Sequence, residues 1–146
     1  MSGAIEIILI FLILANLILL GASRLRNVIR IVALQGLVLG LLPLLAHRDG
    51  LVWAAVLLGA GSAGIKGFIF PAMLNRALRE TQVSREIEPF VGYILSLLAG
   101  VGALALSVWF GACLPLPWPP ASDLLIPAGL FTVWTGLFLI VARRKA

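Results

Sequence analysis

The chain has 146 residues, of which 62% are hydrophobic and 12% are charged, and its mean hydropathy is +1.13. A soluble domain is about half apolar and a quarter charged, so this composition excludes an ordinary soluble protein and predicts an all-α integral membrane protein. The net charge of +5 does not indicate a nucleic-acid partner, because most basic residues flank apolar runs, where they act as topology signals. A single cysteine, Cys113, excludes an internal disulfide and a cysteine metal site built from this chain alone.

Five apolar runs are each about as long as a bilayer-spanning helix and predict five transmembrane helices in one membrane domain, residues 1–146. They cover residues 4–22, 28–46, 51–74, 90–113 and 124–142. The N-terminus has no basic n-region and no clear cleavage site, so we expect the first run to remain as a helix.

Basic residues predict the orientation of these five spans. Only Arg48 lies in the loops of one side, whereas the other side carries Arg24, Arg26, Arg30, Arg76, Arg79, Arg85, Arg143, Arg144 and Lys145. The richer side is predicted to be cytoplasmic, which places the N-terminus outside and the C-terminus inside.

Lys66 is the most informative residue, because it lies within the third apolar run. A charged side chain near the middle of a bilayer costs roughly 3 kcal/mol on insertion scales and requires compensation. No acidic residue of this chain is expected at its depth, which points to a carboxylate or a hydrated path supplied by another polypeptide. The alternative is that Lys66 extends to the cytoplasmic face and has no wider role.

Two amides, Asn16 and Gln35, are predicted within about one helical turn of the depth of Lys66. Together the three side chains could line an ion path as one buried polar layer. The alternative for the amides is that each bonds a neighbouring helix. Glu6 is either a mid-membrane acid or a residue at the outer interface, and Pro71 is expected to kink the third helix near its last turn.

We find no phosphate-binding loop, nucleophile elbow or pair of catalytic carboxylates, and the lone His47 gives no metal-ligand set. The sequence therefore predicts no catalytic residue and no cofactor in this chain.

Three segments resemble the hydrogenase-4 component E family: Ala33–Leu39, Lys66-x-x-x-x-Pro71 and Leu139–Arg144. The resemblance implies a bacterial inner (cytoplasmic) membrane subunit of a formate hydrogenlyase-like, group 4 [NiFe]-hydrogenase related to complex I. It also implies antiporter-like and other membrane subunits as partners, with nickel, iron and iron–sulfur clusters in other chains. Of the family's features, Lys66 and Gln35 transfer to this sequence.

Members of that family usually continue into a second half that resembles a small three-helix subunit of complex I and carries intramembrane glutamates. This sequence ends at Ala146, so we expect that half to be a separate polypeptide or to be absent. The predicted function is an accessory, non-catalytic membrane-arm subunit of a proton- or sodium-translocating complex. The alternatives are a small independent transporter or channel, and a purely structural assembly subunit.

Overall fold

The computed structural model describes residues 2–22, 24–46, 53–80, 92–115 and 122–142, and all secondary structure among these residues is helical. In chain order the elements are α1 (Ser2–Gly21), α2 (Leu25–Ala46), α3 (Trp53–Gly64), the π-helical turn η1 (Ile65–Ile69), α4 (Phe70–Glu80), α5 (Tyr93–Cys113) and α6 (Leu125–Ala142).

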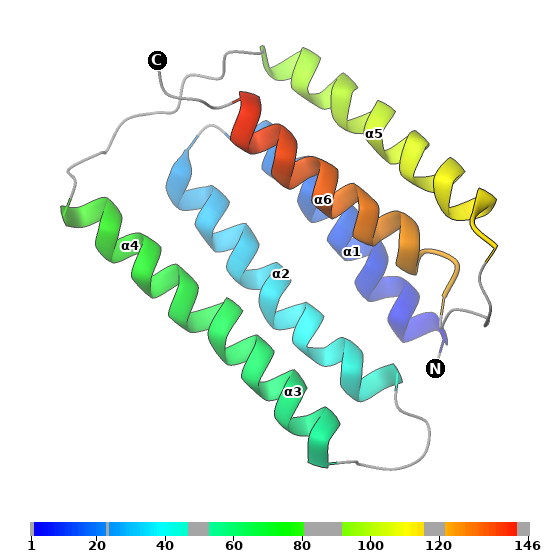
Figure 1. Ribbon diagram of the computed structural model, residues 1–146. Helices are drawn as coiled ribbons and strands as arrows, with labels where there is room; N and C mark the ends of the chain where they lie inside the picture. The colour runs from blue at the N-terminus through cyan, green and yellow to red at the C-terminus, as the bar shows by residue number, and fades with distance from the viewer. Residues whose placement is uncertain (1, 23, 47–52, 81–91, 116–121, 143–146) are drawn as a thin grey trace. The chain divides into compact units, whose positions relative to one another are not determined.

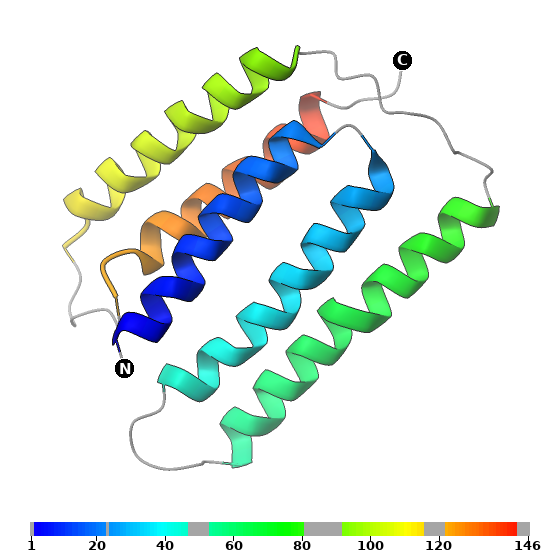
Figure 2. The ribbon, with the colours of Figure 1, turned by 180° about the vertical axis from the view of Figure 1, so that it is seen from behind.

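The helices divide into two compact units by their contacts. The first unit contains α2 and the uninterrupted succession α3, η1 and α4, which we call the long helix and which runs antiparallel to α2 (Figures 1 and 2). The second unit contains α1, α5 and α6, and each of these three helices contacts the other two.

Short local signals set the ends of α5 and α6. Leu114 ends α5 in an extended conformation, with φ −78° and ψ 118°, because the proline that follows it disfavours helical backbone. Before α6, the Ser122 hydroxyl accepts a hydrogen bond from the Leu124 amide at 3.3 Å. Pro127 then lies in the first turn of α6, where its missing N–H leaves no helical bond unmade.

The long helix ends later than the sequence predicts. The third apolar run stops at residue 74, but helical structure continues to Glu80. Arg76 and Glu80 form an ion pair of 3.0 Å across one turn of this extension, an arrangement that supports an exposed helix by about 0.2–0.5 kcal/mol. Pro71 consequently lies well inside the long helix and not in its last turn.

Four helices are long and apolar enough to cross a membrane by length and composition, and α6 is apolar but shorter. These helices are compatible with a membrane protein. The predicted fifth span corresponds to α6, which has 18 residues. The other four predicted spans correspond to α1, α2, the long helix and α5, with ends that differ by a few residues.

Small residues let the helices of the first unit approach closely. A Cβ atom added at Gly40 would lie 2.6 Å from the Cβ of Ala63 and 2.9 Å from the carbonyl oxygen of Gly59. Gly36 lies one turn earlier on α2, and a Cβ atom added there would lie 2.6 Å from the Cβ of Lys66 on the long helix. This Gly-x-x-x-Gly face lets two backbones pack where larger residues would hold them apart.

The second unit has its own buried side chains and close contacts. Phe131 of α6 and Leu9 of α1 are almost completely buried. Gly100 of α5 faces the Leu20 side chain of α1, and a Cβ atom at Gly111 would lie 2.9 Å from Pro127 of α6. The helices of this unit are therefore held by large side chains packed against small ones.

Candidate functional site

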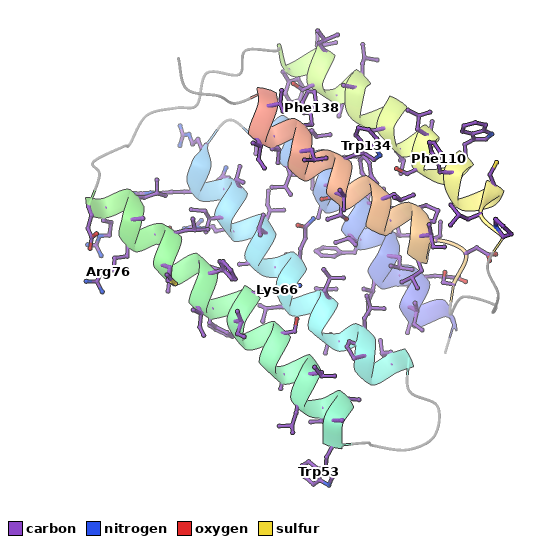
Figure 3. The ribbon with its side chains drawn as sticks, in the orientation of Figure 1. Trp53, Lys66, Arg76, Phe110, Trp134 and Phe138 are labelled. Carbon is purple, nitrogen blue, oxygen red and sulfur yellow. The ribbon has the colours of Figure 1, made fainter. Side chains whose placement is uncertain are left out.

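Lys66 lies in the π-helical turn η1, close to the middle of the long helix (Figure 3). The amide of Phe70 donates to the carbonyl oxygen of Ile65, five residues back, which is the hydrogen-bond pattern of a π-helix. Pro71 lies two residues after the end of this turn and has no N–H to donate to the carbonyl four residues before it. A proline at this position therefore suits a locally widened helix, and such turns occur often at functional sites.

The backbone of Lys66 packs against α2 at Gly36. A Cβ atom added to Gly36 would lie 2.6 Å from the Cβ of Lys66, 3.1 Å from its carbonyl carbon and 3.3 Å from its carbonyl oxygen. Gly67 is equally close to α2, since a Cβ there would lie 2.5 Å from the Leu37 side chain. The contact fixes the stem of the lysine, yet the residue as a whole is exposed.

Within the described part of the first unit, the acidic residue is Glu80, and it is already paired with Arg76. It also lies fourteen positions beyond Lys66 on the same helix, which is about 21 Å at 1.5 Å per residue. The described residues of this unit therefore supply no carboxylate within reach of the Lys66 ammonium.

Gln35 precedes the glycine that contacts Lys66, and it is only 6% exposed. Gly36 brings this part of α2 against the π turn, and the shared polar layer of Gln35 and Lys66 stays a prediction.

Asn16 belongs to the other unit and has a structural role there. Its side-chain nitrogen donates to the Thr132 hydroxyl at 2.9 Å, and that hydroxyl donates to the carbonyl oxygen of Ala128 at 2.7 Å. The residue is only 1% exposed. Asn16 therefore joins α1 to α6 through this hydrogen bond. This is the alternative given above, in which the amide bonds a neighbouring helix.

The remaining acidic candidate, Glu6, is exposed in the second turn of α1. Of the two alternatives for Glu6, this position near a helix end favours a residue at the interface over a mid-membrane acid. The loops that carry His47 and Trp118, and the C-terminal basic cluster, lie outside the described residues.

Two features of these sites were not predicted from the sequence. Thr132, the partner of Asn16, is one of two threonines in the last apolar run, and polar residues in such runs are the available signal for interhelical bonds. The π turn had a signal in Pro71, five residues after Lys66. A proline inside a long apolar run indicates a local irregularity but does not specify its form.

Comparison with models of known protein families finds no match, and no solved structure matches the chain. The chain is 29% identical over 138 residues to an uncharacterized protein, Rv0085, of Mycobacterium tuberculosis. The match covers 92% of this chain and 62% of that protein. The chain therefore spans less than two thirds of the length of the relative that it matches.

Proposed function

We propose that this chain is a non-catalytic membrane subunit of a larger complex, and that Lys66 faces a carboxylate of a neighbouring membrane subunit. The single observation that carries the proposal is an exposed lysine near the middle of a 28-residue apolar helix. In a bilayer that charge costs roughly 3 kcal/mol unless it is compensated. The described residues of its own unit offer no acid within reach.

The topology that accompanies this role has five spans, with the N-terminus outside and the C-terminus in the cytoplasm. Four long apolar helices and the shorter apolar α6 support it. Its orientation rests on the basic residues, which concentrate in alternate loops. The long helix agrees with this arrangement, because Trp53 stands at one end and Arg76 near the other (Figure 3), as interfacial tryptophans and cytoplasmic arginines do.

The resemblance to the hydrogenase-4 component E family favours one kind of complex. In that proposal the chain packs beside antiporter-like subunits of a group 4 [NiFe]-hydrogenase in a bacterial inner membrane, and the complex couples hydrogen chemistry to proton or sodium translocation. The metal cofactors belong to other subunits. Lys66 and the buried Gln35 then complete a polar axis between subunits.

The experiment replaces Lys66 by Ala, Met and Arg in the intact complex and measures assembly and the ions translocated per hydrogen formed. We expect Ala and Met to impair assembly or translocation and Arg, which keeps the charge, to retain part of both. Leu58→Ala on the same helix is the matched control, because Leu58 is 69% exposed and uncharged. Normal assembly and translocation in Lys66→Ala and Lys66→Met would overturn the proposal.

A purely structural subunit is the second candidate, and two glycines favour it. A Cβ atom added at Gly61 or Gly64 would meet nothing within 4 Å, so this side of the long helix is open to another helix. A scaffold of this kind tolerates Lys66→Met but loses its partners when Gly61 or Gly64 becomes bulky. Assembly measured in these variants separates the two candidates.

A further inference from the structure

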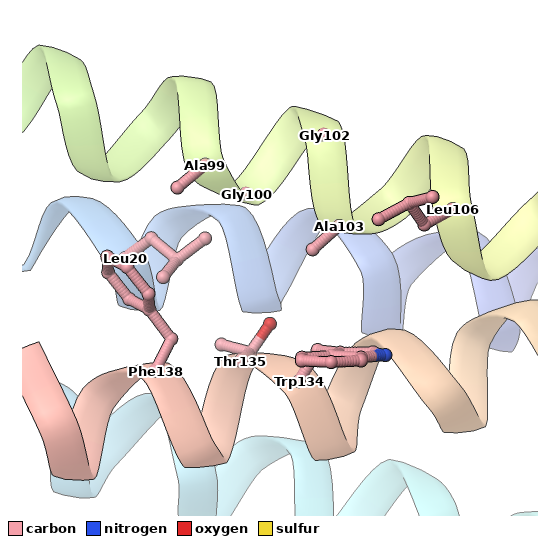
Figure 4. A pocket seen from close by; sticks show the side chains of 9 residues that line it. All are labelled: Leu20, Ala99, Gly100, Gly102, Ala103, Leu106, Trp134, Thr135 and Phe138. Atoms are coloured by element: carbon pink, nitrogen blue, oxygen red, sulfur yellow. The ribbon is translucent and has the colours of Figure 1, made fainter.

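The second unit contains a cleft between α5 and α6 that the proposed role of Lys66 does not involve. Its volume is about 320 Å³, within the range of small-molecule sites. Figure 4 shows its lining, which combines aromatic side chains and a threonine of α6 with small residues of α5 and one leucine each from α1 and α5: Leu20, Ala99, Gly100, Gly102, Ala103, Leu106, Trp134, Thr135 and Phe138.

One polar atom in this lining lacks a partner. The hydroxyl oxygen of Thr135 is buried and makes no hydrogen bond to any described residue, and the residue is only 3% exposed. Two other buried or half-buried hydroxyls behave differently, since Ser107 and Thr132 donate to carbonyl oxygens four residues back at 2.8 and 2.7 Å. The Thr135 hydroxyl is directed from α6 toward α5, into the cleft between Trp134 and Phe138 (Figure 4).

A buried hydroxyl without a partner is costly, so the occupant of this cleft should supply a hydrogen-bonding atom. Water fits poorly, because a buried water needs two to four polar partners, and the only other polar side-chain atom of the lining, the Trp134 indole nitrogen, points away from this hydroxyl (Figure 4). A phospholipid also fits poorly. Thr135 lies near the middle of the 18-residue α6, whereas the ester carbonyls of phospholipids lie at the edge of a hydrocarbon core about 30 Å thick.

We infer that the cleft binds the ring of a planar, lipid-soluble carbonyl compound, the chemistry of an isoprenoid quinone, with a ring carbonyl accepting the Thr135 hydroxyl hydrogen. Trp134 and Phe138 provide aromatic surface for the ring, and Ala99 and Ala103 of α5 leave room for it. The half-exposed Trp134 and Leu106 allow an apolar tail to leave the cleft toward the lipid.

The test uses the full chain in lipid nanodiscs, with Trp53, Trp109 and Trp118 replaced by Phe so that Trp134 is the sole tryptophan, and its fluorescence is measured. Decylubiquinone is the probe, and decylbenzene, which lacks carbonyls, is the control ligand. We expect saturable quenching by decylubiquinone, and about tenfold weaker binding to Thr135→Val, the value of one hydrogen bond. Decylbenzene should bind with the same affinity whether residue 135 is Thr or Val, because it has no carbonyl to accept the hydroxyl hydrogen.

Thr135→Val also has a readout that does not need ligand. Because the substitution removes an unpaired buried hydroxyl and keeps the side-chain shape, it should raise the thermal midpoint of the ligand-free chain. Gly102→Leu places a side chain at an open position of the lining and should abolish the quenching. Non-saturable quenching, equal affinity in Thr135→Val, or a retained phospholipid that decylubiquinone does not displace would each overturn the inference.

Discussion

Two polar residues in apolar helices, the buried Asn16 and the exposed Lys66, differ in the partners that the chain gives them. Asn16 is a neutral amide, and one hydroxyl of a neighbouring helix, that of Thr132, serves as its partner. Lys66 carries a charge, and the described part of its unit provides no carboxylate within reach. The amide is therefore explained within the chain, whereas the described residues of its unit leave the lysine without a carboxylate, which is why we propose one in a neighbouring subunit.

A double-mutant cycle tests the structural role of Asn16. We expect Asn16→Ala and Thr132→Ala to share a coupling energy of about 0.6–1.7 kcal/mol, the range for interhelical hydrogen bonds in membrane proteins. Unfolding in detergent micelles measures it, with Asn16→Ala combined with Ser107→Ala as a control pair, because Ser107 bonds its own helix. A coupling energy of zero for Asn16 and Thr132 would contradict the assignment.

Among the elements, the pair formed by α2 and the long helix shows what the sequence could predict. The Gly36-x-x-x-Gly40 pattern is typical of a close helix–helix approach, and both glycines contact the long helix. The glycines of the third apolar run divide into two cases. Gly67 faces α2, whereas Gly61 and Gly64 have open space around them.

Glycine substitutions separate folding from assembly at this element. Gly36→Ala and Gly40→Ala should each lower the free energy of unfolding by about 1–3 kcal/mol, because the added Cβ overlaps Lys66 or Ala63. Gly61→Ala and Gly64→Ala should not destabilise the isolated chain. Denaturation in micelles compares the four variants, and equal destabilisation by all of them would show that the packing face is wrongly assigned.

Helix ends and helix faces were harder to predict than helix existence. The third helix was expected to end where hydropathy falls, but an exposed ion pair and good helix formers extend it to Glu80. In α1 nearly every residue is apolar, so periodicity could not distinguish its packed face from its lipid-facing one. Pro71 indicates an irregularity near the π turn but not its form, and the unpaired Thr135 hydroxyl became visible only once the packing of α6 in its unit was known.

Across the whole molecule, large apolar side chains remain exposed on every helix of the two units. Ile7, Leu57, Phe68, Ile94 and Ile140 are each at least 69% exposed, a pattern that a soluble monomer would not sustain. Lipid can cover most of this surface, and in the proposed topology the Lys66 ammonium is the group that lipid tails cannot stabilise. This exposed apolar surface is compatible with a membrane protein, and the proposed protein neighbour would act at Lys66.

Lys66 and Lys145 are the lysines of this chain, which makes a direct test feasible. In native membranes that hold the intact assembly, Lys145→Arg leaves Lys66 as the one lysine able to react. A membrane-soluble carbodiimide activates buried carboxyl groups, and an amine in contact with one forms an isopeptide bond. Mass spectrometry of the digested complex then identifies both ends of each cross-link.

The proposal predicts a cross-link from Lys66 to an aspartate or glutamate in a membrane helix of another subunit, absent from Lys66→Arg. A membrane-impermeant amine reagent should leave Lys66 unmodified from both faces of the membrane. Modification of Lys66 by that reagent, together with no carbodiimide cross-link in an intact assembly, would contradict the account.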